Sequence, residues 1–248
     1  MARHAVLLLL VLCSAAVGTA IAPRATPLDG ARQALIVVTA DWDSVPGTLR
    51  RFQRASAAEP WTPVGDSIPV VVGASGLGWG IGLHGGPPPR PGPVKHEGDN
   101  RAPAGVFRLG SAFGYAARPP WMKLPYVRAS AALKCVDDPA SSHYNQVLDQ
   151  RKVRVDWNSH EDMRRRDDAY RFGVIVEHDW GARRQPGAGS CIFLHIWGGP
   201  GSSTVGCTAM SADNLATLLR WLDPARAPVL VQLPREQYRQ LHALWRLP

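Results

Sequence analysis

Short runs of apolar and β-branched residues recur along the chain, separated by segments rich in glycine, proline and polar residues. Runs of this length, bounded by turn residues, are typical of buried β-strands. They predict strands at residues 34–39 (ALIVVT), 68–72 (IPVVV), 106–109 (VFRL), 172–177 (FGVIVE) and 228–234 (PVLVQLP). A further strand is predicted over residues 190–197, SCIFLHIW, where strict alternation places Cys191, Phe193 and His195 on one face.

The spacing of apolar residues changes after residue 207. Leucines recur at helical spacing and Ser211 is a suitable N-cap, so a helix is predicted that ends before Pro224, with apolar positions at Leu215, Leu218, Leu219 and Leu222. The tail over residues 235–247 is expected to form a short helix. Residues 45–54 are expected to form a turn followed by a short basic segment.

The domain organisation follows from these elements. Residues 121–170 are polar with interleaved aromatic residues, a pattern that fits either the lining of a binding cleft or the core of a cap over the main sheet. The sequence predicts a short linker over residues 23–33 and one mainly β (α+β) domain over residues 34–248.

The N-terminus has the pattern of a secretory signal peptide, which we place at residues 1–22. Arg3 and His4 precede a short apolar run, and small residues follow up to Ala22. Cleavage is expected after Ala20, with cleavage after Ala22 or an uncleaved anchor as alternatives. No later segment is apolar over the length that a membrane span needs. We therefore expect an exported protein of the periplasm or cell envelope.

Composition and charge exclude some classes of protein. The 248 residues include 24 glycines and 22 prolines without a fixed period, which excludes collagen-like and solenoid folds. The formal net charge is +8, which would attract anionic envelope polymers, although an overall compositional bias toward arginine would give the same charge. No basic helix, zinc-finger spacing or aromatic RNA-binding motif indicates nucleic acid.

Removal of the signal peptide would leave three of the four cysteines. In an oxidising compartment two of them are expected to pair and one to remain free. We favour a disulfide between Cys135 and Cys191, with Cys207 free. The alternatives are a structural disulfide that includes Cys207, or three reduced cysteines.

The free cysteine is a candidate nucleophile. His195 closes a predicted strand, and a segment rich in glycine, proline, serine and threonine joins it to Cys207. A histidine is a suitable base for a thiol, and Gly206 would let the backbone approach a substrate carbonyl. The amides of Val205, Gly206 and Cys207 are expected to bind the oxyanion.

These residues resemble the active-site motif of the L,D-transpeptidase (YkuD-like) family. That motif is a histidine closing a strand, a glycine-rich connection and then Ser/Thr-His-Gly-Cys, and here residues 204–207 are TVGC. Residues 101–109, RAPAGVFRL, are similar to the family's Thr-Pro-x-Gly-x-Phe strand. The resemblance implies a β-sandwich of mixed sheets, with the site at one end and a helix after the cysteine.

The resemblance also implies a reaction. Cys207 would attack a carbonyl of a peptidoglycan stem peptide, with His195 as base and the Ile196 carbonyl orienting its ring. The resulting thioester would pass to an amine acceptor, and no metal or organic cofactor is required. The sequence departs from the family pattern at Val205, where histidine is usual, and at Ala209, where Arg or Asn is usual.

Two further expectations concern the fate of the acyl group and the substrate contacts. GCTAM, residues 206–210, is similar to a divergent YafK-like branch that includes hydrolases, so hydrolysis of peptidoglycan peptide bonds is the alternative activity. The candidate substrate-binding residues are Ser203, Thr204, Trp197 and Arg101.

Two other functions are also compatible with the sequence. A metal hydrolase could use ligands among Glu177, His178, Asp179, His195 and Cys207, although no tight ligand motif such as HExxH is present. A non-catalytic envelope-binding protein would keep Cys207 as a structural residue. The sequence predicts no oligomeric state.

Overall fold

The computed structural model of the chain describes residues 1, 25–85, 91–182 and 184–248. It is mainly β, with 36% strand and 12% helix, as the sequence predicts. The signal peptide expected over residues 1–22 lies outside the described residues, apart from Met1. None of the helices in the described part of the chain has the length and apolar character that crossing a bilayer requires.

Within the described residues, eight strands form a closed barrel of mixed parallel and antiparallel pairs. The order around the barrel is β10-β11-β12-β3-β2-β1-β13-β5, and β5 then pairs with β10. These strands are β1 (Gln33–Thr39), β2 (Pro46–Gln53), β3 (Thr62–Val71), β5 (Ala102–Gly114), β10 (Phe172–Val176), β11 (Phe193–Ile196), β12 (Thr208–Met210) and β13 (Val229–Pro234).

The closed barrel corrects the expectation of a β-sandwich. The reason is the length of β5, whose first part pairs with β13 at residues 105–108 and whose last part pairs with β10 at residues 109–114. One strand thereby joins both ends of the sheet, and closure removes the free edges that an open sheet would present. Two short strands, β4 (Leu77–Trp79) and β6 (Tyr126–Arg128), add to β5 in parallel.

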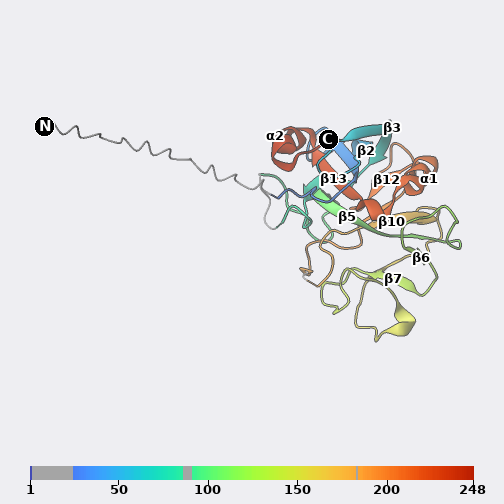
Figure 1. The fold of residues 1–248 in the computed structure, drawn as a ribbon. Helices are drawn as coiled ribbons and strands as arrows, with labels where there is room; N and C mark the ends of the chain where they lie inside the picture. The colour runs from blue at the N-terminus through green and yellow to red at the C-terminus, as the bar shows by residue number, and fades with distance from the viewer. Residues whose placement is uncertain (2–24, 86–90, 183) are drawn as a thin grey trace.

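Two helices cover the barrel, and Figure 1 shows them flanking its upper part. Helix α1 (Ala212–Trp221) buries Leu215, Leu218 and Leu219, and the Ser211 side chain accepts a hydrogen bond from the Asn214 amide as predicted. Helix α2 (Arg235–Trp245) buries Leu241 and Trp245. Apolar residues at helical spacing therefore pack each helix against the core. A 3₁₀ turn, η2 (Pro224–Arg226), follows α1.

The polar segment over residues 121–170 contains a second sheet, separate from the barrel. Its three strands are β7 (Leu133–Val136), β8 (Val147–Asp149) and β9 (His160–Asp162), and the 3₁₀ turn η1 (Gln150–Lys152) follows β8. Figure 1 shows β7 below the barrel. The disulfide expected between Cys135 on β7 and Cys191, just before β11, is present and ties the two parts together.

Three boundaries differ from the sequence-based expectations. Residues 46–53, expected as a turn and a basic segment, form β2, because Leu49 and Phe52 are buried while arginines occupy positions between them. The segment expected to be a linker packs against the core through Leu28 and Ala31, whose carbonyls accept hydrogen bonds from Arg54. The strand expected over residues 190–197 is shorter, because Cys191 has a positive φ of 56°.

Candidate active site

The parallel pairing of β11 and β12 brings His195 and Cys207 together. His195 lies opposite Ala209 in this pair, and Cys207 immediately precedes β12. The amide of Phe193 donates a hydrogen bond to Cys207 Sγ at 3.3 Å, so Cys207 lies next to Phe193, which is two residues before His195. Cys207 lies two residues before Ala209, the partner of His195, so the Cys207 and His195 side chains lie on the same face of the sheet. Both side chains line one pocket of about 460 Å³.

His195 is held by the contact that the sequence predicted. Its Nδ1 lies 2.8 Å from the carbonyl oxygen of Ile196, which fits a neutral ring with the proton on Nδ1. Burial lowers the pKa of His195 to about 4, so the ring is neutral near pH 7. Nε2 then has a lone pair available to accept a proton.

Cys207 is a buried thiol, 3% exposed, whose Sγ lies 3.5 Å from the carbonyl oxygen of Cys191. Burial, together with the nearby Glu161 carboxylate, raises the pKa of Cys207 well above its ordinary value. The resting form is therefore the thiol, which becomes a strong nucleophile only after its proton is removed.

The turn before Cys207 is held by Thr204. The Thr204 hydroxyl donates to the carbonyl oxygen of Cys207 at 2.7 Å and accepts from the Gly206 amide at 3.2 Å. Thr204 therefore holds the turn and also lines the pocket with His195 and Cys207, and the Gly206 amide, which was expected to bind the oxyanion, is already engaged. The amides of Val205 and Cys207 remain the candidates for binding an oxyanion.

Glycine is required at position 206. Its φ of 154° lies in a region that other residues rarely adopt. A Cβ there would lie 3.3 Å from the carbonyl oxygen of Arg101. A larger residue at this position would therefore displace the turn that carries Cys207.

The other predicted substrate-binding residues divide into two groups. Ser203 and Trp197 line the pocket with the His–Cys pair, and so does Val205, whose side chain is 71% exposed. Arg101 does not line it. Its guanidinium donates to the carbonyl oxygen of Leu77 at 2.8 Å and contacts the Asp43 carboxylate at 2.8 Å, so this arginine is structural.

The structure adds two residues that the sequence did not indicate. Tyr170 lines the pocket with His195 and Cys207, and its ring packs edge-on against the imidazole, with centroids 5.3 Å apart. The Tyr170 hydroxyl hydrogen-bonds to the carboxylate of Glu161 on β9. Both residues come from the polar segment, which has no periodicity that could have identified them.

A metal centre finds no support in the geometry. The described residues contain no cluster of three or more His, Cys, Asp or Glu side chains placed to bind a metal ion. His178, one of the ligand types considered, is engaged at both ring nitrogens: Nδ1 accepts from the Ile81 amide at 3.1 Å, and Nε2 lies 3.0 Å from the Ala188 carbonyl oxygen.

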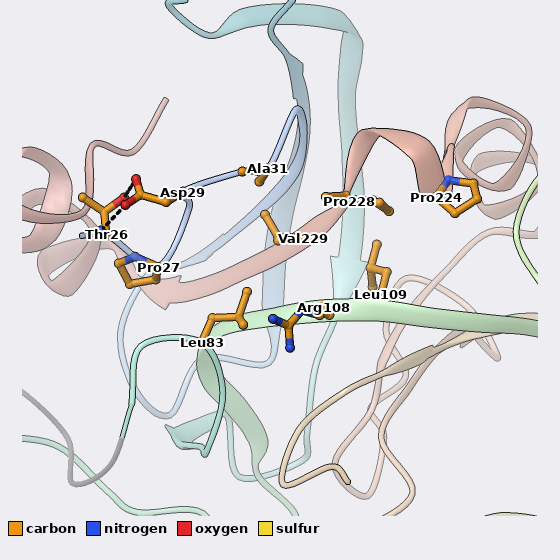
Figure 2. Close-up of a pocket in the computed structure, with 12 residues that line it drawn as sticks. Thr26, Pro27, Asp29, Ala31, Leu83, Arg108, Leu109, Pro224, Pro228 and Val229 are labelled. Carbon is orange, nitrogen blue, oxygen red and sulfur yellow. Dashed lines mark hydrogen bonds between the residues drawn. The ribbon is translucent and has the colours of Figure 1, made fainter. Parts of the chain in front are cut away.

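A second cavity, of about 450 Å³, lies elsewhere on the molecule (Figure 2). Thr26, Pro27 and Asp29 from the N-terminal segment line one side, and Arg108 and Val229 come from β5 and β13. Thr26 and Asp29 hydrogen-bond to each other, as the dashed lines in Figure 2 show. The cavity is about as large as the one at Cys207, but no cysteine or histidine lines it.

Comparison of the chain with models of protein families, with curated proteins and with solved structures finds no match. The functional assignment therefore depends on the sequence motifs and on the geometry around Cys207.

Proposed function

We propose that this protein is a cysteine-dependent acyltransferase of the L,D-transpeptidase type, acting on peptidoglycan stem peptides. One observation carries the proposal: a neutral histidine with one nitrogen fixed by a backbone carbonyl shares a pocket with a free thiol. A nucleophile and its base must lie in one site, and the shared pocket meets that requirement. The motif resemblance at residues 195–207 and 101–109 supplies the substrate class.

The reaction would proceed through a thioester. His195 Nε2 accepts the thiol proton, and the thiolate attacks a peptide carbonyl of the substrate. The amides of Val205 and Cys207 donate to the oxyanion, and protonated His195 gives its proton to the leaving amine. An amine of a second stem peptide then attacks the thioester and releases Cys207.

The pocket suits a charged peptide substrate. Trp197 provides an apolar surface, while Arg165 and Asp168 provide charges of both signs at its edge. A stem peptide that carries both amino and carboxyl groups could contact both. An exported location is also part of the proposal, and the Cys135–Cys191 disulfide supports it because disulfides persist in oxidising compartments.

The test is covalent labelling by a carbapenem, an acylating drug to which the family resemblance predicts sensitivity. Mass spectrometry of the purified mature protein should show one added drug molecule on Cys207. The Cys207→Ala variant should show none, and His195→Asn should acylate slowly. No adduct on a wild-type protein whose Cys207 is still free and open to a small alkylating reagent would contradict the proposal.

Purified muropeptides then separate transfer from hydrolysis. A cross-linked product in the presence of an acceptor amine indicates transpeptidation. A shortened stem peptide without cross-links would instead place the enzyme with the hydrolases that the GCTAM motif suggests. If neither product forms, the result would support a non-catalytic, envelope-binding function.

A further inference from the structure

The turn over residues 165–170 lies beside the strand that carries the candidate base. The Ile196 amide of β11 donates a hydrogen bond to the Ala169 carbonyl at 3.0 Å. From its other side the turn is held by Tyr115, whose hydroxyl accepts a hydrogen bond from the Arg165 amide at 3.2 Å. The turn is therefore fixed next to β11, and its side chains reach the pocket.

The Arg165 guanidinium is placed in the site by an aromatic ring. Its Cζ lies over the Tyr170 ring, 5.2 Å from the centroid, and the same ring packs edge-on against the His195 imidazole, with centroids 5.3 Å apart. Tyr170 is 4% exposed and also packs edge-on against Phe113 and Phe193, so its ring is held by close packing. The guanidinium and the imidazole therefore lie around one fixed ring, and both line the substrate pocket.

Arg165 has hydrogen-bond donors to spare for a ligand. Its Nε and Nη2 donate to the Asp167 carboxylate at 2.9 and 2.7 Å, and no other described residue accepts from this side chain. A guanidinium has five N–H donors in one plane, so both donors of Nη1 and one of Nη2 remain unused.

The other charges of the pocket do not compete for these donors. Asp168 also lines the pocket, and its carboxylate pairs with Arg171 at 3.3 Å. Among the described residues that line the pocket, Arg165 is the one lysine or arginine. The pocket thus offers a cation with unused donors beside carboxylates that already have partners, which is the arrangement that a ligand carboxylate needs.

The proposed reaction indicates which substrate carboxylate this would be. His195 gives its proton to the leaving amine, so the leaving group lies on the His195 side of the bond that breaks. Arg165 lies on the same side, because the Tyr170 ring contacts both side chains. In an amino acid one carbon separates the amine from the carboxylate, so both groups of a leaving amino acid can be contacted together.

We propose that Arg165 binds the free carboxylate of the leaving amino acid, an inference that rests on the proposed function. Arg165 is then the residue that determines specificity for the acyl donor. The enzyme would break the last peptide bond of a stem peptide that ends in a free carboxylate. It would act poorly on internal bonds and on peptides whose terminal carboxylate is amidated, because these lack the anion that Arg165 pairs with.

The experiment measures the equilibrium binding of two synthetic stem tetrapeptides to the full mature Cys207→Ala chain, which cannot form a thioester. One peptide ends in a free carboxylate and the other in a carboxamide. The carboxylate peptide should bind about tenfold more tightly, since 43% of the Arg165 side chain is exposed and water weakens the charged hydrogen bonds.

A second change in the same chain removes the guanidinium. Arg165→Gln should weaken binding of the carboxylate peptide about tenfold and leave the carboxamide peptide unchanged, so the preference disappears. Arg165→Lys should keep part of the preference, because lysine retains the charge but not the planar set of donors.

Arg164→Gln is the matched control. It removes the same charge from the neighbouring residue, whose Cζ lies over the Tyr115 ring at 4.9 Å and which does not line the pocket. This variant should keep the full preference for the carboxylate peptide. Thermal unfolding should show that all variants are folded.

The outcomes separate this inference from the proposed function. A preference that persists in Arg165→Gln, an equal loss of affinity for both peptides, or no binding of either peptide overturns the role of Arg165. Carbapenem acylation of Cys207 in the wild type would still leave the proposed function standing. A preference that depends on Arg165, with no acylation or muropeptide conversion by wild type, supports the carboxylate site and contradicts the proposed function.

Discussion

Two histidines, one after β10 and one on the neighbouring strand β11, have similarly lowered pKa values but different hydrogen-bond partners. His178 follows β10 and His195 lies on β11, and burial lowers the pKa of each to about 4. His178 is 1% exposed and both its ring nitrogens contact backbone groups. His195 uses one nitrogen for the Ile196 carbonyl and reaches a pocket that Cys207 shares.

The comparison shows that a shifted pKa does not by itself mark a catalytic residue. Burial produces the same shift in a histidine that connects two backbone segments and in one that can accept a proton. What distinguishes His195 is a ring nitrogen free for chemistry beside a cavity. We therefore expect changes at His195 to alter the rate of acylation and changes at His178 to alter the free energy of unfolding.

The largest expected effect is on acylation in His195→Asn. Loss of the base should reduce the rate of covalent labelling about 10²–10⁴-fold, while the asparagine amide can still donate to the Ile196 carbonyl and keep the fold. Stopped-flow or timed mass spectrometry gives the rate. Unchanged labelling in this variant would remove the distinction between the two histidines.

His178→Ala should affect stability instead. The change leaves the Ile81 amide and the Ala188 carbonyl without partners and opens a cavity, which should lower the free energy of unfolding by about 2–5 kcal/mol. Urea denaturation measures the loss. His242→Ala, an exposed position on α2, is the matched control and should change stability by less than about 0.5 kcal/mol. Equal effects of the two changes would contradict the structural role of His178.

A smaller effect is expected from pH. Unfolded His178 would titrate at its ordinary pKa of 6.5 and folded His178 at about 4. The unfolded state therefore binds more protons between these values, and the contribution of His178 to stability is lost as pH falls through this window. The difference in unfolding free energy between wild type and His178→Ala should shrink by about 3 kcal/mol from pH 6.5 to 4. A difference independent of pH would show that the pKa of His178 is the same in the folded and unfolded protein.

Much of the fold was predictable because its strands and helices carry strong local patterns. The apolar run at residues 34–39 and the leucine spacing in α1 both predict the observed elements. Barrel closure was not predictable, since it depends on β5 pairing with β13 and β10, which lie far from it in the sequence. Strand β2 was missed because a register shift between Leu49 and Arg51 places its buried residues, Leu49 and Phe52, three apart and so breaks the alternation expected of a strand.

Some residues of the candidate site were also predictable from the sequence, and others were not. His195 and Cys207 were found because they flank a glycine-rich connection within one short stretch. Tyr170 and Glu161 each line a cavity with Cys207, but the tertiary packing that places them there leaves no sequence pattern. Arg101 was predicted to contact substrate because an arginine can pair with a carboxylate, yet its side chain pairs with Asp43 and the Leu77 carbonyl.

The Cys135–Cys191 disulfide has a consequence for how active molecules are made. Cys191 belongs to the native bridge and also lies beside the free thiol of Cys207, so an oxidant that reaches the unfolded chain can join any two of Cys135, Cys191 and Cys207. A Cys135–Cys207 or Cys191–Cys207 bridge would consume the candidate nucleophile. The yield of active protein would then depend on the cell's capacity to reshuffle disulfides during maturation, since exchange with a thiolate is the route from a wrong bridge to the native one.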